Sequence, residues 1–176
     1  MILDSLLRFT GANGQALTTQ AATPSTDVID LHMSGIPALA NLQGARDLGI
    51  GTMLKLTTVV TTTFTSGGAG TLSVAIQGAP DNGSGVPGSY TTWWLSPTYA
   101  LATLVQGAKL FEMDMPRPPA GVGVPRFLRM LFTIATADFT GGVVQSFIVL
   151  DRPDQMYQGT SNAVLGGYPA GITIAN

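Results

Sequence analysis

Two near copies of one short motif constrain the fold of this chain more than any other feature. The first is Phe64-Thr65-Ser66-Gly67-Gly68 and the second is Phe139-Thr140-Gly141-Gly142. Glycine supplies the positive φ that tight connections between strands demand. The flanking runs are rich in β-branched and apolar residues, which is typical of strands; they span residues 53–63, 71–77, 126–136 and 143–150. The sequence therefore predicts two β-hairpins in an antiparallel β-protein.

Alternation along these runs predicts which side chains form the core. Leu56, Val60 and Phe64 share one face of the first run, and the other face is mostly threonine. In the third run Phe127 and Leu131 are apolar on the face opposite Leu128, Met130, Phe132 and Ile134, so we expect this strand to be covered on both sides.

The rest of the chain adds shorter elements and long connections. We expect one β-sandwich domain over residues 1–176, with residues 1–26 as an extended arm and residues 155–176 as an irregular tail. Short strands are predicted at 28–32, 90–95 and 110–115, and a breaker-rich exposed loop at 78–88. Ser96-Pro97 resembles the start of a helix and Gly107 its end, which predicts a short helix over 98–106. Strands of this number joined by turns and long loops indicate a sandwich or jelly roll.

Charged residues are unusually scarce. They make up 10% of the chain, with a net charge of -2 and a mean hydropathy of +0.31, whereas soluble domains carry about 25%. Because interface centres are depleted of Lys, Glu and Asp, a surface covered by other proteins would explain the deficit. A monomer kept soluble by threonine and glutamine is the alternative.

Other function classes lack their usual signals. No apolar run approaches the roughly 20 residues of a membrane-spanning helix, and the start of the chain lacks the pattern of a secretion signal. The two Lys and six Arg are scattered, so we expect no nucleic-acid partner and no membrane partner. Cysteine is absent, which removes disulfides and thiolate chemistry.

No group of residues forms a recognisable catalytic, cofactor or metal site. His32 is the single histidine and has no Gly-x-Ser-x-Gly motif to serve. Glu112 and Asp114 would share one strand face, which is more typical of a solvated edge than of an acid–base pair. The segment 49–51 lacks the remaining glycines of a nucleotide-binding loop, and Asn82-Gly83-Ser84 is better explained as turn chemistry than as a glycosylation site.

The adjacent pair Trp93-Trp94 is the strongest candidate for a contact site. Neighbouring residues of a regular strand point to opposite faces, so one indole needs a cover outside the core. That cover is a protein or, in the alternative hypothesis of a carbohydrate- or receptor-binding module, a sugar. The interface candidates are Trp93, Trp94, Phe127, Leu131, Tyr157 and Tyr168.

The order of the motifs resembles a known family. The order is Val28-Ile29-Asp30-Leu31, Arg46-Asp47-Leu48-Gly49-Ile50-Gly51, the first Phe-Thr-x-Gly-Gly-like tip, Arg126-Phe127-Leu128-Arg129 and then the second tip. This order resembles that of the capsid cement proteins of short-tailed phages, the family of the Bordetella phage cement protein. The likeness covers nearly the whole chain.

The resemblance implies an all-β, antiparallel β-sandwich of jelly-roll type with long loops and an extended N-terminal arm. It also implies a structural protein of the virion without catalysis or cofactor. Such a protein binds the outer surface of an icosahedral head as a homo-oligomer, a dimer or trimer, and clamps neighbouring copies of the major capsid protein. The arm 1–26 and the tail after residue 155 are the segments expected to lie along neighbours.

Overall fold

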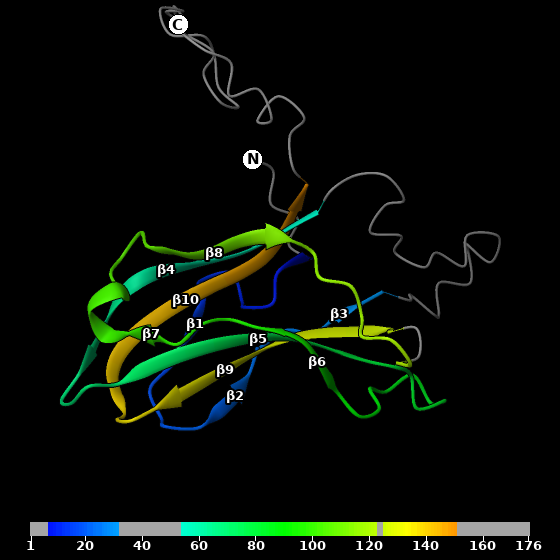
Figure 1. Ribbon diagram of the computed structural model, residues 1–176, viewed down its shortest axis with the longest axis horizontal. Helices are drawn as coiled ribbons and strands as arrows, with labels where there is room; N and C mark the ends of the chain where they lie inside the picture. Colours follow the sequence, from blue (N-terminus) through cyan, green and yellow to red (C-terminus); the bar gives the residue numbers. More distant parts are fainter. Residues whose placement is uncertain (1–6, 32–53, 123–124, 151–176) are drawn as a thin grey trace, which may run out of the picture.

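The protein is a sandwich of two antiparallel sheets packed face to face (Figure 1). The computed structural model describes residues 7–31, 54–122 and 125–150. One sheet has four strands in the order β1-β10-β4-β8, and the other has six, with the path β2-β9-β5-β6 and with β3 and β7 beside β9 and β5. The elements are β1 (Gln15–Ala16), β2 (Ala22–Pro24), β3 (Ile29–Asp30), β4 (Leu54–Ser66), β5 (Thr71–Ala79), β6 (Thr91–Leu95), β7 (Tyr99–Ala100), the 3-10 turn η3 (Leu101–Thr103), β8 (Lys109–Asp114), β9 (Phe127–Ala135) and β10 (Phe139–Leu150).

The four long strands form one antiparallel ribbon that is folded over at its middle. Strand β4 pairs with β10 from Leu54↔Leu150 to Ser66↔Phe139, and β5 then pairs with β9 from Thr71↔Ala135 to Ala79↔Phe127. The prediction of two hairpins is therefore wrong. β4 and β5 lie in different sheets, as do β9 and β10, so each glycine-rich motif turns the chain from one sheet to the other (Figure 1).

The two turns pack against each other through the phenylalanines of the repeated motif. The rings of Phe64 and Phe139 meet edge to face with centroids 4.8 Å apart, and each side chain is 3% exposed. A Cβ on Gly142 would lie 2.2 Å from the Phe64 ring, and one on Gly70 would lie 2.7 Å from the Phe139 ring. Each phenylalanine thus needs a glycine of the other turn, Gly142 for Phe64 and Gly70 for Phe139.

The core between the sheets follows the predicted alternation. Leu56, Val60 and Phe64 of β4 are buried, and β9 contributes a similar inward face. One polar contact lies inside this core: the hydroxyl groups of Thr58 and Ser146 are 2.7 Å apart and both residues are fully buried. Because each hydroxyl has a partner, the pair avoids the cost of an unsatisfied buried polar group.

The N-terminal segment packs on its own sandwich, which corrects the expectation for residues 7–26. Phe9 and Leu17 are buried in the core, β1 extends the four-stranded sheet and β2 extends the six-stranded one. Gln15 joins the two: its Nε2 donates to the Pro24 carbonyl at 2.9 Å, and its Oε1 accepts from the Thr26 N–H at 2.8 Å. Residues 1–6 and the tail 155–176 lie outside the described residues.

The predicted helix over residues 98–106 is also wrong. Ser96 does not cap a helix; its Oγ accepts from the Val74 N–H at 2.9 Å, which holds the chain against β5. Strand β7 and the single turn η3 follow, and Gly107 ends the segment with a φ of 83°. Among the described residues there is no α-helix, and none of their helical segments is long and apolar enough to cross a membrane.

Candidate functional site

The two carboxylates of β8 form a solvated edge, as predicted. Asp114 pairs with Lys55 of β4 at 2.6 Å, and Glu112 pairs with Lys109 on its own strand. Both carboxylates are exposed, and each faces a lysine rather than the other acid. Within residues 7–31, 54–122 and 125–150, no three His, Cys, Asp or Glu side chains are grouped as a metal site would require. His32 and the segment 49–51 lie outside these residues.

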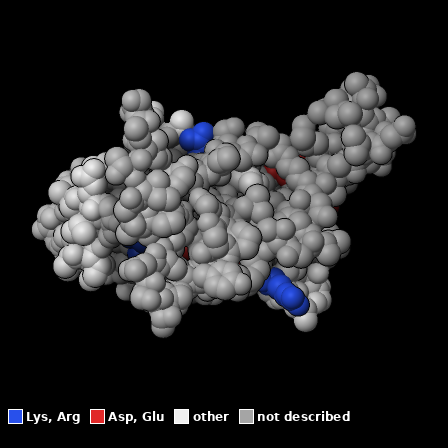
Figure 2. Space-filling view, turned by 90° about the horizontal axis from the view of Figure 1, so that it is seen from above, with Lys and Arg blue, Asp and Glu red and all other residues white. Residues whose placement is uncertain are grey.

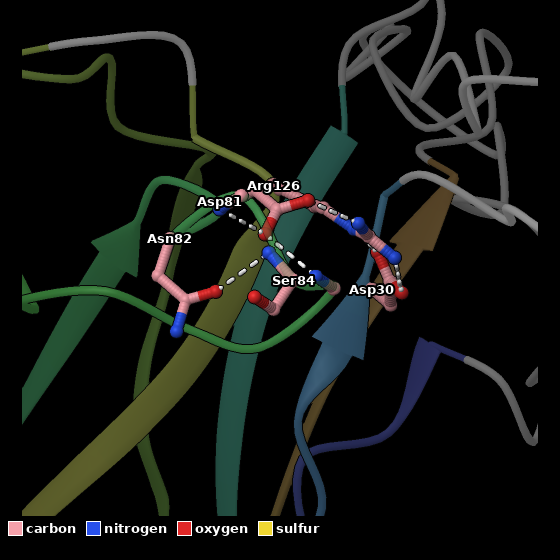
Figure 3. Close-up of polar contacts among 7 residues, drawn as sticks. Asp30, Asp81, Asn82, Ser84 and Arg126 are labelled. Carbon is pink, nitrogen blue, oxygen red and sulfur yellow. Dashed lines mark hydrogen bonds and ion pairs between the residues drawn. The ribbon is translucent and has the colours of Figure 1, made fainter.

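Arg126 ties three segments together at one end of the sandwich (Figure 3). Its Nε and Nη2 donate to the two carboxylate oxygens of Asp30 in β3, each at 2.9 Å, and its Nη1 donates to Asp81 in the loop after β5. The hydrogen bonds to Asp30, followed by those to Asp81, raise the pKa of Arg126 against the opposing effect of desolvation. Because a forked pair of bonds fixes the guanidinium plane, this junction orients the loop relative to β3 and β9.

The loop after β5 is exposed, as predicted, and is ordered by its own side chains. Asp81 Oδ1 accepts from the N–H groups of Gly83 and Gly85, each at 2.9 Å, while Asn82 Oδ1 accepts from the Ser84 N–H at 2.9 Å (Figure 3). Desolvation raises the pKa of Asp81, but the Gly83 N–H, Arg126 and the Gly85 N–H outweigh it, so the net pKa is lowered. The side chain of Asn82 therefore serves the turn, as its local sequence suggested.

Trp93 and Trp94 both pack against the core, which corrects the expectation that they face opposite ways. The register of β6 on β5 shifts between Ile76 and Gln77, so Trp93 is an extra residue in the strand. Trp94 meets Phe111 of β8 edge to face at 4.8 Å, and Trp93 lies over Gly78, where a Cβ would be 2.1 Å from its ring. Both indoles are half-buried against the core, so neither points fully outward as the carbohydrate alternative required.

The outer face of the six-stranded sheet carries an apolar row across four strands. Leu95 of β6 lies opposite Ala75 of β5, Ala75 lies opposite Leu131 of β9, and Leu131 lies opposite Pro24 of β2. We call these four residues the apolar row. Leu95 is 60% exposed and Pro24 is exposed, whereas Ala75 is buried and Leu131 is half-buried.

A cation is held in place beside the apolar row. The Arg129 guanidinium lies over the Tyr90 ring with its Cζ 3.6 Å from the centroid, and its Nε donates to Gln77 Oε1 at 2.8 Å. Gln77 Nε2 in turn donates to Thr92 Oγ1 at 3.0 Å. We call Arg129, Tyr90, Gln77 and Thr92 the Arg129 anchor. Burial raises the pKa of the Tyr90 hydroxyl despite the nearby guanidinium.

The carboxylate edge of β8 and the surface around the apolar row differ in charge. The edge of the four-stranded sheet holds the Lys55, Lys109, Glu112 and Asp114 ion pairs, whereas the apolar row and the Arg129 anchor together contain one charged side chain. Lys and Arg atoms appear as separate spots rather than one basic patch on the face seen in Figure 2. The described cations visible there thus give no continuous surface for a polyanion.

The structure brings together some of the predicted interface residues and separates others. Leu131 lies in the apolar row, as its outward position predicted. Phe127 is 5% exposed and lies beneath the Arg126 guanidinium, whose Cζ is 4.8 Å from the centroid of the Phe127 ring. Tyr157 and Tyr168 lie outside the described residues. Sequence reasoning missed Arg129 and Leu95. The strand alternation that places Leu131 outward also places Arg129 outward, so that signal was present.

Comparison with models of protein families gives a match to this chain. Residues 11–148 match the model of the Bbp16 family, named for Bordetella phage protein 16, a capsid cement protein. The matched range contains the four long strands of the folded ribbon up to Ile148. A search of curated proteins finds no match to this chain.

Proposed function

The chain belongs to the Bbp16 family of phage capsid cement proteins, and we propose that it clamps neighbouring subunits of the major capsid protein from outside an icosahedral head. Family membership makes it a structural protein of the phage capsid surface that binds capsid proteins, and not an enzyme. The match over residues 11–148 is the observation that carries this conclusion.

The distribution of charge supports the clamp. The chain has 10% charged residues, and four of its described carboxylates, those of Asp30, Asp81, Glu112 and Asp114, are already in ion pairs. A surface this poor in unpaired charge loses little solvation when another protein covers it. Because burial of apolar area is worth roughly 25 cal/mol per Å², a contact repeated at many joints of the shell adds up to a large cost of separation.

Several finer features belong to the same proposal. The folded ribbon supports a sandwich of jelly-roll type, because each half of the ribbon is a strand pair within one sheet and the two halves lie in different sheets. We further propose one domain over residues 1–176 and assembly as a dimer or trimer, with neither nucleic acid nor membrane as a partner. The tail 155–176, with Tyr157 and Tyr168, remains a candidate contact segment, whereas residues 7–26 are committed to their own sandwich.

Binding to purified heads tests this function. Heads that lack the protein are mixed with purified chain, sedimented, and analysed for bound protein, for density on the outer surface by electron microscopy and for resistance to heat. We expect saturable binding, outer density and a higher temperature of head disruption. A β-sandwich of similar size from another source is the control. If the protein stays in the supernatant with intact heads, the proposed function is wrong.

The tail and the oligomer are tested separately. A chain ending at residue 154 should bind heads more weakly than the full chain if the tail contacts a neighbour. Analytical ultracentrifugation of the full chain should show a dimer or trimer. A monomer at all accessible concentrations would refute the oligomer while leaving the clamp to be judged by the sedimentation of heads.

A further inference from the structure

We propose that the apolar row and the Arg129 anchor together form the surface that docks on a capsid subunit, with Arg129 binding a carboxylate of that subunit. This inference rests on the proposed function and specifies the surface and the chemistry of the contact. The two groups are neighbours on one face, because Arg129 and Leu131 are alternate residues of β9 and Gln77 and Ala75 are alternate residues of β5.

The anchor prepares Arg129 for a carboxylate. Its Nε donates to Gln77 and its plane lies on the Tyr90 ring, while none of the hydrogen bonds and ion pairs among the described residues involves its two terminal nitrogens. A guanidinium presented in this way offers a planar fork that matches the two oxygens of a carboxylate. Holding the side chain in advance also reduces the entropy lost on binding.

The apolar row supplies area beside the charge. Leu95 is 60% exposed although it is a large aliphatic side chain, and Leu131 and Pro24 continue the row to the opposite edge of the sheet. An arginine next to exposed aliphatic and aromatic groups is the composition found at the energetic centres of protein interfaces.

The absence of a carboxylate from this surface favours a different protein over a second copy of the chain. In a two-fold contact the same patch serves both partners, and this patch has no carboxylate to offer the Arg129 of a second copy. The nearby carboxylates of Asp30 and Asp81 are already bound by Arg126. Like charges in such a contact oppose association. A capsid subunit that presents an acidic side chain within an apolar surface satisfies both parts of the patch.

Binding of variants to heads that lack the protein tests the inference. Labelled wild-type protein, Arg129→Gln, Arg129→Lys and Leu95→Thr are titrated against the heads. Arg117→Gln is the matched control, because Arg117 is an exposed arginine outside the patch. We expect Arg129→Gln to raise the Kd at least about tenfold, Arg129→Lys to recover only part of the loss, and Arg117→Gln to stay within about twofold. Leu95→Thr should raise the Kd about threefold or more.

The outcomes separate this inference from the proposed function. Failure of wild-type protein to bind would overturn both. If wild-type protein binds and Arg129→Gln binds equally well, or if Arg117→Gln is weakened as much, this inference alone is overturned. The same holds if Arg129→Gln changes the oligomer in ultracentrifugation and leaves head binding intact, since the patch would then be a self-contact. Thermal melts check that each variant is folded. If Arg129→Gln unfolds, binding of Leu95→Thr to the heads tests the docking surface instead, because the Leu95 side chain is outside the core.

Discussion

Replacing Gly142 with alanine should destabilise the protein far more than the same change at the neighbouring Gly141. Gly142 has a φ of 143°, and a Cβ there would lie 2.2, 2.4 and 2.6 Å from three atoms of the Phe64 ring. At Gly141 the nearest heavy atom to a Cβ is Thr65 Oγ1 at 3.2 Å. Two adjacent glycines of one motif therefore provide a matched pair of variants.

The size of the effect follows from two costs. A side chain in a sparsely populated backbone region costs about 1–3 kcal/mol, and overpacking a buried aromatic costs about 1–3 kcal/mol. Because alanine restricts the unfolded chain more than glycine does, the substitution also offsets about 0.4–1 kcal/mol of this loss of stability. We therefore expect Gly142→Ala to lower the free energy of unfolding by about 3 kcal/mol and the Tm by roughly 6–12 °C. Gly141→Ala should change the free energy by less than about 1 kcal/mol.

Thermal melts and urea unfolding of the purified variants measure both quantities. Combining Gly142→Ala with Phe64→Leu then separates the two costs, because removing the ring relieves the clash and leaves the backbone strain. We expect the double variant to lose about 1 kcal/mol less than the sum of the single variants. Equal stability of Gly142→Ala and Gly141→Ala would refute the explanation based on the Phe64 ring and the backbone of Gly142. Strict additivity with Phe64→Leu would assign the whole cost to the backbone.

Three further variants test other contacts. Gly78→Ala should displace the Trp93 ring, lower the free energy of unfolding by about 1–3 kcal/mol and shift tryptophan fluorescence to longer wavelength. Gln15→Ala should cost about 1–3 kcal/mol in urea unfolding, because two backbone groups of the β2 segment lose their partner, whereas Gln20→Ala, at an exposed site, should cost little. Ionised Asp81 stabilises the fold above its ordinary pKa of 3.8, and this contribution is lost as the pH falls through its lower folded pKa. The Tm of Asp81→Asn should therefore be lower than that of the wild type at pH 7, and the two Tm values should converge near pH 2.

For each of these three variants, one result would contradict the prediction. Gly67→Ala is the control for Gly78→Ala, because no heavy atom lies within 4 Å of a Cβ there, and equal losses would dismiss the Trp93 contact. Equal losses for Gln15→Ala and Gln20→Ala would dismiss the bridge between the sheets. A constant gap between wild type and Asp81→Asn from pH 2 to pH 7 would show that ionisation of Asp81 is not the cause.

The strands could be predicted from the sequence, but their partners could not. Alternation identified the inward faces of β4 and β9, because each strand buries one face whichever sheet it joins. A glycine turn between two such strands suits a hairpin and also a passage between sheets. The distinguishing contacts, Phe64 with Gly142 and Phe139 with Gly70, join residues far apart in the chain, so no local pattern contains them.

The candidate site was partly predictable for a similar reason. Leu131 followed from alternation in a regular strand, and Trp93 failed because one extra residue in β6 reverses the expected face. Arg129 lies in one of the motifs of the family resemblance, but its fixed position depends on Tyr90 and Gln77, which are distant from it in the sequence. The packing of the N-terminal segment on its own core was missed because Phe9 ends a short apolar start and Leu17 stands in a small, polar stretch, so neither belongs to an alternating pattern.

The folded ribbon also determines when the chain acquires its shape during synthesis. One of the two inner strands on the path of each sheet, β9 or β10, comes from the C-terminal half. The partners of these strands lie up to 129 residues earlier, in the pair of Gln15 with Val144. Strand pairing over such separations is slow and leaves earlier segments exposed while they wait. Nascent chains therefore cannot complete the six-stranded sheet until β9 has left the ribosome, nor the four-stranded sheet until β10 has left it. Fragments released early have no finished surface to offer a growing particle.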